Sequence, residues 1–392
     1  MPPAFLKHPF LSLACMSLLL AGCQLPEDGG GVTVRRAQAA NGAELYSGGS
    51  ALNVPMRASE INQVARMLAG MEASSGGPRD AYSWPYHQKQ MDALWRRYDE
   101  GRGLKIRAWA GREISDLQRY RSVFYPFSGP DFLYAQDLFP SAETYILCGL
   151  ESAEPLPDFR SLTAGEVAIG LNGLRQSLDG IVNAGYFVTT DMRSDFQSTR
   201  LRGTLPILLV FLARSGAQVE SVDVVQLDAS GTPVLAAVTS GSAPGLMIRF
   251  RNGMGGLKRL FYFRQDLSNG STRLGGPFLT FVAKQGTPPA MVKSASYLMH
   301  NSDFSNIRQY LLRSTPGIVQ DPSGVPYRDL VGAGLSVDLY GRYQGTLDIF
   351  SQQQPDLMAA YGNGQHRVQA LDFGYGYLYR ASTTSIMVAR RR

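Results

Sequence analysis

The sequence predicts an α+β body in which N-terminal helices precede an antiparallel sheet. Between residues 56 and 121, apolar residues recur at spacings of three and four, which is typical of helices that bury one face. From residue 122 onward, the apolar runs are short, alternating or rich in β-branched residues, and turn residues separate them. The chain has 392 residues and is 44% hydrophobic, so it can bury one large core or two smaller ones.

Three helices are expected in the helical segment 56–121. They cover about 58–71, 85–100 and 104–121, and the third is interrupted near Gly111. Together they can cover one face of a sheet. In the first helix, the buried face is expected to consist of Ile61, Val64, Met67, Leu68 and Met71.

The strands are expected mostly as hairpins. Candidate strands cover 122–125 and 144–150, and Asp228 and Gly231 suit the turn of a hairpin between 222–227 and 232–238. A Gly-rich turn connects 246–251 with 257–264, and the run 278–284 is expected to extend the sheet as a further strand. This pattern predicts an antiparallel meander.

Several short sequence motifs recur in the same order in the two halves of this region. Leu174-Arg-Gln-Ser-Leu178 and Gly180-Ile-Val182 are matched by Ile307-Arg-Gln-Tyr-Leu311 and Gly317-Ile-Val319. The recurrence suggests an internal duplication, with α+β halves at 122–270 and 271–392 facing each other across a groove. The alternative that the sequence leaves open is that these short motifs match by chance.

The N-terminus has the order of an export signal. Lys7 is followed by an apolar stretch over 10–20, which is too short for the about 20 residues of a membrane-spanning helix. The stretch ends in Leu20-Ala21-Gly22-Cys23, which resembles the lipobox of bacterial lipoproteins. The resemblance implies that the signal peptide 1–22 is removed and that Cys23 carries lipid. An ordinary secretory signal is the alternative. Residues 23–55 are rich in Gly, Ala and Ser and are expected to be a flexible tether.

The same resemblance indicates a location. Gln24 occupies the position where Asp favours retention in the inner membrane, so the lipoprotein class implies an outer-membrane protein facing the periplasm. Without the signal peptide, 37 basic residues stand against 32 acidic ones. This excess suits contact with anionic lipid or a cell-wall polymer. Nucleic acid is not expected as a partner of an exported, anchored chain.

Cysteine and histidine are too sparse for a predicted metal site or cofactor. Cys148 is the one thiol that neither leaves with the signal nor carries lipid, and it lies in the apolar run 145–150. A buried, inert thiol is the simpler interpretation, and a reactive nucleophile is the alternative. The sequence has no CxxC, no HExxH and no cluster of histidines.

The block Phe124-Tyr-Pro-Phe-Ser-Gly-Pro-Asp-Phe-Leu-Tyr134 contains a Ser close to an Asp. We expect Ser128 as the N-cap of a helix that ends before Pro140, with Asp131 at the third helical position of a capping box. Phe127 and Phe132 then occupy the positions of a hydrophobic staple. A role for Asp131 as an acid, base or ligand is the alternative.

A second block, Lys293-Ser-Ala-Ser-Tyr-Leu-Met-His300, places Ser296 and His300 four residues apart. On a helix they share one face, and with Asp131 they supply the residue types of a Ser–His–Asp relay. The alternative is that this segment packs inward and that His300 binds a carbonyl near a helix end. The sequence lacks a GxSxG elbow and a Walker A loop.

The last third is rich in Tyr and Gly. Tyr340, Arg342 and Tyr343 are candidates for contact with a glycan or a protein, and core packing of the tyrosines is the alternative. These tyrosines lie within roughly residues 90–380, where the chain resembles bacterial envelope proteins of unassigned function. The motifs that carry this likeness are the blocks 125–132 and 145–151 and the segment Asp321-Pro-Ser-Gly-Val-Pro-Tyr327. The likeness implies one integrated body but no activity.

These observations favour a lipid-anchored envelope protein with a binding or structural role. Its partners would be the membrane, through Cys23, and a cell-wall polymer or another envelope protein. The alternative is an envelope hydrolase that acts on a cell-wall or glycan substrate, and the sequence leaves the catalytic question open. The two hypotheses differ in geometry, because a hydrolase of the relay type requires Asp131, Ser296 and His300 to converge within hydrogen-bond distance.

Overall fold

The computed structural model describes residues 56–71, 83–154, 156–157, 159–185, 201, 203–236, 244–364 and 366–391. Within these residues the chain forms helices and one mixed sheet, so the predicted α+β class is confirmed. Cys23, the signal 1–22 and the tether 23–55 lie outside the described residues. In the described part of the chain, no helix combines the length and the apolar character needed to cross a bilayer.

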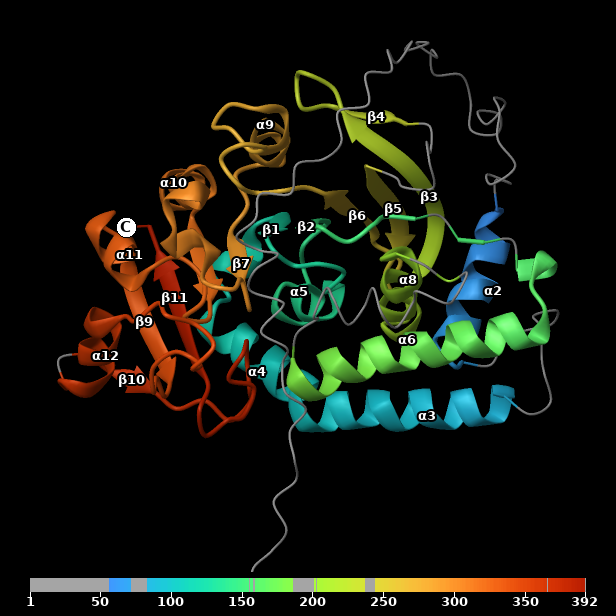
Figure 1. Cartoon of the computed structure of the whole chain (residues 1–392), viewed down its shortest axis with the longest axis horizontal. Coiled ribbons are helices and arrows are strands. Elements are labelled where there is room, and N and C mark those ends of the chain that lie inside the picture. Colours follow the sequence, from blue (N-terminus) through green and yellow to red (C-terminus); the bar gives the residue numbers. More distant parts are fainter. Residues whose placement is uncertain are drawn as a thin grey trace, which may run out of the picture. The chain divides into compact units, whose positions relative to one another are not determined.

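The helices precede and flank the strands (Figure 1). As predicted, α2, α3 and α4 come before the first strand. The α-helices are α2 (Ala58–Leu68), α3 (Ser83–Tyr98), α4 (Leu104–Glu113), α5 (Phe132–Leu138), α6 (Ala164–Ala184), α8 (Leu205–Arg214), α9 (Pro277–Lys284), α10 (Ser305–Ser314), α11 (Tyr327–Gly332) and α12 (Pro355–Gly362).

The described strands form a single sheet of 11 strands in the order β10-β9-β11-β8-β7-β1-β2-β6-β5-β3-β4. The strands are β1 (Ser122–Tyr125), β2 (Thr144–Gly149), β3 (Gln218–Leu227), β4 (Pro233–Leu235), β5 (Gly245–Arg251), β6 (Leu257–Arg264), β7 (Ala290–Val292), β8 (Gly317–Gln320), β9 (Ser336–Gly341), β10 (Val368–Gln369) and β11 (Ser385–Arg390). Both predicted hairpins are confirmed, since β3 pairs with β4 and β5 with β6 in antiparallel register.

The centre of the sheet is parallel, so the prediction of an antiparallel sheet is wrong there. The neighbours β8, β7, β1, β2 and β6 all pair in parallel. Strands β1, β7 and β8 are buried along their whole length, as expected for strands covered on both faces. Their sequences are short apolar runs, which do not reveal the direction of pairing.

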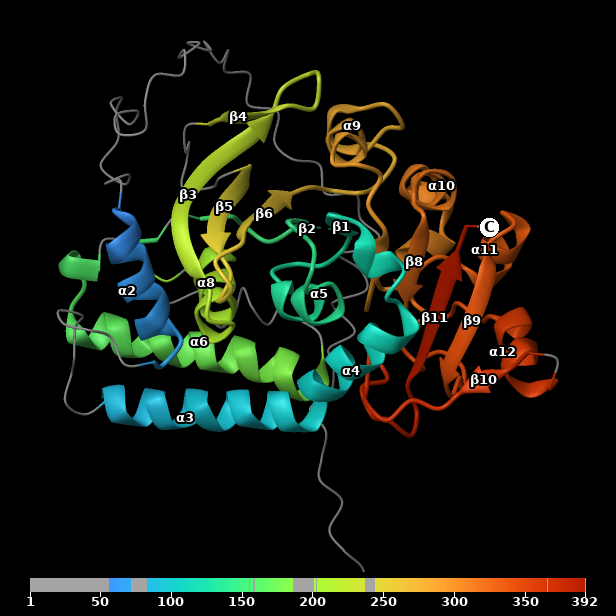
Figure 2. The same cartoon turned by 180° about the vertical axis from the view of Figure 1, so that it is seen from behind.

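Helices cover both faces of the sheet (Figures 1 and 2). Successive side chains of β1 enter opposite cores, with Val123 and Tyr125 on one face and Phe124 on the other. The first core contains side chains of α2, α3, α4, α5, α6 and α8: Leu68, Met91, Ile106, Leu133, Leu174 and Leu208. The second contains side chains of α9, α10, α11 and α12: Phe281, Ile307, Leu330 and Leu357.

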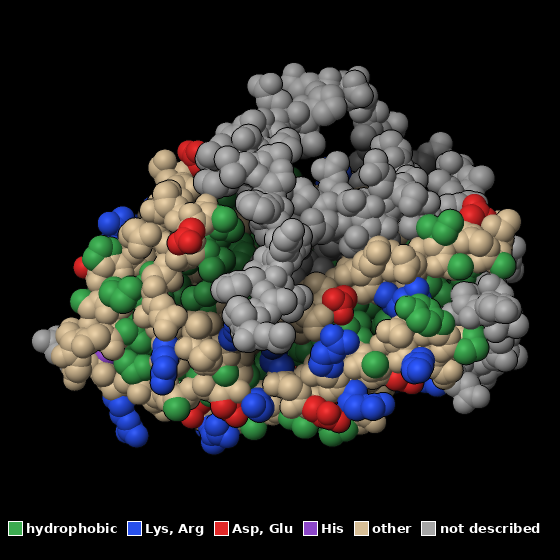
Figure 3. Space-filling model, turned by 60° about the horizontal axis from the view of Figure 1, so that its bottom comes forward, with side chains coloured by type: hydrophobic (Ala, Val, Ile, Leu, Met, Phe, Trp, Pro, Cys, Tyr) green, Lys and Arg blue, Asp and Glu red, His purple; other side chains and the backbone are tan. Residues whose placement is uncertain are grey.

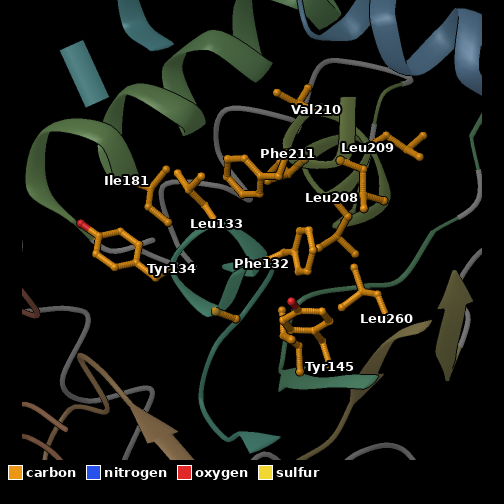
Figure 4. Packing of buried hydrophobic residues seen from close by; sticks show 14 of the residues in the cluster. Phe132, Leu133, Tyr134, Tyr145, Ile181, Leu208, Leu209, Val210, Phe211 and Leu260 are labelled. Atoms are coloured by element: carbon orange, nitrogen blue, oxygen red, sulfur yellow. The ribbon is translucent and has the colours of Figure 1, made fainter. Parts of the chain in front are cut away.

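The first core is centred on α5 and α8. Figure 4 shows Phe132 of α5 between Leu208 of α8 and Tyr145 of β2. The rings of Phe132 and Tyr145 meet edge to face with centroids 5.0 Å apart. This packing fixes α5 over the sheet, and α5 in turn positions the loop that follows β1.

The run 278–284 forms helix α9, so its predicted assignment as a strand is wrong. Pro277 occupies the first turn, where a missing N–H costs nothing. The apolar residues of the run also fit a helical face, because Phe278, Leu279, Phe281 and Val282 are all buried.

The internal repeat is not a structural duplication. Gly180-Ile-Val182 lies inside α6, whereas Gly317-Ile-Val319 forms β8. The strands of the predicted halves 122–270 and 271–392 belong to one continuous sheet, in which β7 of the second half pairs with β1 of the first. The halves therefore do not face each other across a groove.

Candidate functional site

The sheet has a topological switch point between β1 and β7. The chain leaves β1 through α5, on the face of the first core, to reach β2. It leaves β7 through α10, on the opposite face, to reach β8. In open sheets of this kind, ligands bind outside the carboxyl ends of the strands at the switch point. The residues that follow β1, β7 and β8 are therefore the first place to look for a site.

A buried ion pair lies at this point. Lys293, directly after β7, contacts Asp131, which precedes α5, with 2.6 Å between Nζ and Oδ2. The two side chains are 1% and 2% exposed. Lys293 also donates to the carbonyl of Gly185 at the end of α6, and its Nζ lies 3.6 Å from the ring centroid of Tyr134. The ammonium group is thus enclosed by a carboxylate, a carbonyl and an aromatic face.

Tyrosines complete the surroundings of Asp131. The Tyr125 hydroxyl donates to its Oδ2 at 2.9 Å, and the Tyr134 backbone N–H donates to its Oδ1 at 3.2 Å. Burial lowers the pKa of Lys293, and the carboxylate of Asp131 opposes this shift. Burial, with the negative charge of Asp131, raises the pKa of Tyr125 well above its ordinary value. Tyr125 is therefore a neutral hydrogen-bond donor.

A second buried carboxylate, Asp321, follows β8 and holds the neighbouring loops together. It accepts hydrogen bonds from the Ser323 hydroxyl at 2.5 Å and from three backbone N–H groups, those of Ser294, Ser323 and Tyr377. A Cβ on Gly376 would lie 2.0 Å from its Oδ2, so only glycine fits there. We call Tyr125, Asp131, Tyr134, Lys293 and Asp321 the carboxyl-edge cluster.

The loops around this cluster contain strained backbone. Ser294, Ser296 and Tyr297 after β7, and Phe127 after β1, all have φ between 52° and 59°. The left-handed region costs such residues of order 1 kcal/mol or more each, and strain of this kind concentrates at functional sites. The structure therefore tolerates local strain where the two loops meet.

The three residues of the predicted relay do not form one. Ser296 is not on a helix, because it and Tyr297 have positive φ and only residues 298–300 form a 3₁₀ turn. Its hydroxyl binds the Tyr377 hydroxyl at 2.8 Å, while Asp131 is bound to Lys293. The Nε2 atom of His300 is buried without a hydrogen-bond partner in the structure. Burial lowers the pKa of His300 to about 4, so its imidazole is neutral at neutral pH.

Four rings line the outer side of the strained loop. Tyr297 contacts His300 and Phe350 with centroids 5.1 and 4.9 Å apart, and Phe350 contacts Tyr377 at 5.1 Å. Tyr297 is buried and the other three are half-buried. We call these residues the aromatic row. The Tyr377 hydroxyl donates to the Ser294 carbonyl at 3.0 Å, so Ser296 must donate to Tyr377, and the Ser296 oxygen is left as an acceptor.

Comparisons with protein-family models, curated proteins and solved structures gave no significant match to this chain. The function is therefore argued from the geometry of the site. Among the described residues, no group of three or more His, Cys, Asp or Glu side chains is placed to hold a metal ion.

Asp131 caps α5, but from a different position than predicted. It is itself the N-cap, accepting from the backbone N–H of Tyr134, while the Ser128 hydroxyl and the Cys148 backbone bind each other across to β2. Phe127 is turned by its positive φ and packs against Phe304, with centroids 6.0 Å apart. The predicted capping box and staple are therefore wrong by three residues.

The predicted contact residues near 340 are mainly structural. Tyr340 and Tyr343 are 2% and 6% exposed, and the Tyr340 hydroxyl donates to Glu113 of α4 at 3.0 Å. Arg342 alone is exposed, so the three residues do not form a contact surface. Cys148 is fully buried, and burial raises the pKa of its thiol to about 12, which agrees with an inert thiol.

Sequence patterns gave Lys293 of the cluster no role, and they gave Asp321 only a place at the start of a motif. Each of the two directly follows a short apolar run that becomes a buried parallel strand. A charged residue in that position is a usable signal, because carboxyl ends of neighbouring parallel strands meet at one edge of the sheet.

Proposed function

We propose that this protein is a lipid-anchored component of the bacterial cell envelope that binds a cell-wall polymer at the carboxyl edge of its sheet. The observation that supports binding there is the coincidence of a buried ion pair and strained loops at the switch point. The aromatic row supports a sugar ligand, because half-exposed rings stack on the apolar faces of sugars while Ser296 offers an acceptor for a hydroxyl.

The hydrolase hypothesis receives no support from these contacts. Asp131 is neutralised by Lys293, and Asp321 has its oxygens occupied by four hydrogen bonds. Neither carboxylate is placed beside Ser296 or His300 by a hydrogen bond in the structure. A polymer-binding role requires only a fixed surface, which this loop arrangement provides.

Binding is tested with purified peptidoglycan sacculi in a pelleting assay. Phe350→Ala and Tyr377→Ala each remove a half-exposed ring, and we expect each to weaken binding up to roughly tenfold. Tyr86→Ala is the matched control, because Tyr86 is 56% exposed on α3, an element outside the aromatic row. The polymer-binding role is refuted if the wild-type protein stays in the supernatant. It is also refuted if Tyr86→Ala loses as much binding to the sacculi as Phe350→Ala and Tyr377→Ala do.

Anchoring is tested separately by growing cells with a labelled fatty acid. The wild-type chain should take up label and fractionate with the outer membrane, and Cys23→Ser should do neither. Label on the Cys23→Ser chain would contradict the anchor and leave the pelleting result unaffected.

A further inference from the structure

A groove between α10 and α11 lies on the face of the second core. Its volume is about 470 Å³. Residues 305, 308, 309, 312 and 313 line it from α10, at helical spacing, while Ile307, Tyr310 and Leu311 of the same helix are buried in the core. Residues 328, 329, 332 and 333 form the opposite wall. A Cβ on Gly332 would meet nothing within 4 Å, so this wall is open.

The charge of the groove is predominantly positive. Three arginines, Arg308, Arg313 and Arg328, face a single carboxylate, that of Asp329. Asp329 lies 3.3 Å from Nε of Arg308 and 3.6 Å from Nε of Arg328. One carboxylate cannot neutralise three guanidinium groups, so the groove carries an excess of about two positive charges.

The three arginines differ in how firmly they are held. Arg308 donates to the carbonyls of Met299 and Asn301 and is only 22% exposed, so its guanidinium is fixed at the base. Arg328 is 74% exposed. The side chain of Arg313 is exposed and forms no hydrogen bond or ion pair with any described residue. Two exposed guanidinium groups therefore flank one that is held in place.

This arrangement contrasts with other charged regions of the protein. Figure 3 shows acidic and basic side chains interspersed on the face that it displays. On other elements, several exposed basic residues have an acidic partner of their own, as in the pairs Arg97–Asp179 and Arg121–Glu143. In the groove, by contrast, three arginines share the single carboxylate of Asp329.

We propose that this groove binds the phosphate headgroup of an anionic membrane lipid. Guanidinium groups bind phosphate oxygens through paired hydrogen bonds, which the exposed Arg313 and Arg328 can offer, while Arg308 adds a fixed positive charge beside them. The half-buried Leu312 on the floor offers apolar contact beside the charge. This contact is additional to polymer binding at the carboxyl edge, and it orients the body against the bilayer.

The test measures flotation of the full-length Cys23→Ser chain with vesicles, so that lipidation does not contribute. Vesicles of phosphatidylcholine are compared with vesicles of phosphatidylcholine and phosphatidate. We expect tighter binding to the phosphatidate vesicles, and Arg313→Ala with Arg328→Ala should reduce it on the order of 30-fold. High salt should likewise weaken the binding of the parent Cys23→Ser chain to phosphatidate vesicles.

The matched control carries Arg96→Ala and Arg112→Ala, two exposed arginines on α3 and α4. It has the same net charge as the groove variant, so it should keep the preference for phosphatidate. Unchanged thermal unfolding of both variants verifies that they are folded. The proposal is overturned if the parent chain binds both vesicle types equally. It is also overturned if the groove variant and the control variant lose the same amount of binding to phosphatidate vesicles.

Discussion

Single residues hold the carboxyl edge together through buried polar contacts, and Lys293 is the main one. It joins the loop after β7 to Asp131, to the end of α6 and to the face of Tyr134. A buried pair of this kind is costly to assemble and more costly to break, because the partner is left as an unpaired buried charge. Lys293 therefore couples three separate segments of the chain.

Replacing Lys293 by methionine should destabilise the fold by about 3–5 kcal/mol, because Asp131 remains buried without its counter-ion. Denaturant unfolding followed by circular dichroism measures the change. Adding Asp131→Asn to Lys293→Met should recover part of the loss. Lys105→Met is the control, since Lys105 and its partner Asp372 are 42% and 73% exposed and should contribute about 1 kcal/mol or less. If Lys293→Met lowers the free energy of unfolding by less than Lys105→Met does, Lys293 does not have this role.

His87 gives the fold an acid-sensitive contact. Its Nδ1 lies 2.9 Å from Nη1 of Arg175, which can only donate, so Nε2 carries the proton and donates to the Leu68 carbonyl at 3.0 Å. Burial lowers its pKa from 6.5 to about 4. The unfolded chain therefore takes up this proton at a higher pH than the folded chain, and stability falls as the pH drops from 6.5 to about 4.

His87→Gln should remove this dependence, because glutamine can donate to Leu68 and accept from Arg175 without titrating. We expect the free energy of unfolding of the wild type to lose roughly 3 kcal/mol more than that of the variant between pH 7 and pH 4. Asp137, whose pKa burial raises to about 6, acts in the opposite direction and is common to both chains. His366→Gln, at an exposed site, is the control. If the free energy of unfolding changes with pH in the same way for the wild type and for His87→Gln, His87 is not the source of the acid sensitivity.

At the scale of elements, helix ends and turns decided which predictions succeeded. Both hairpins were predicted because short-range turn chemistry defines them, and β1 was predicted from its short apolar run. Helix α9 is hard to predict because Phe, Thr and Val fit a strand and a short helix equally well, although Pro277 in its first turn favours the helix. The segment 294–297 does not have the helical conformation that would place Ser296 and His300 on one face, and positive φ at serine and tyrosine leaves no signature in composition.

The turn after α9 offers a test of backbone strain. Thr287 is exposed and has φ of 47°, a conformation that is unfavourable for a β-branched residue. Thr287→Gly should raise the free energy of unfolding by about 1 kcal/mol, because glycine adopts this conformation without strain. Thr287→Ala should raise the free energy of unfolding by less, because alanine keeps a Cβ. Thermal unfolding measures both, and destabilisation by the glycine would show that the turn is not strained.

At the scale of the whole molecule, the two cores share one sheet and should unfold together. Leu208→Ala in the first core and Ile318→Ala in the second each remove a fully buried side chain and should cost about 2–5 kcal/mol. Both substitutions should shift the same single transition, followed by tryptophan fluorescence and by circular dichroism. Two transitions that respond separately would indicate that the halves 122–270 and 271–392 fold independently.

The global arrangement was the least predictable part. Local patterns located helices at 56–121 and most strands, but the parallel centre depends on pairing between distant segments, such as Phe124 of β1 with Ala290 of β7. No short-range pattern encodes that contact. Only one residue of the buried ion pair was predictable for the same reason. Asp131 was a candidate because of the motif that contains it. Its partner Lys293 lies more than 160 positions later in the sequence and comes close to it only because β1 and β7 are neighbours in the sheet.

The place of β11 has a consequence for the order in which the sheet can close. This strand follows β9 and β10 in the chain, yet it lies between β8 and β9 and pairs with both. Until residues 385–390 are available, β8 and β9 each present an open edge that none of the other described strands fills. The sheet therefore closes late, and during synthesis those two edges are exposed to pairing with other chains until the last strand is in place.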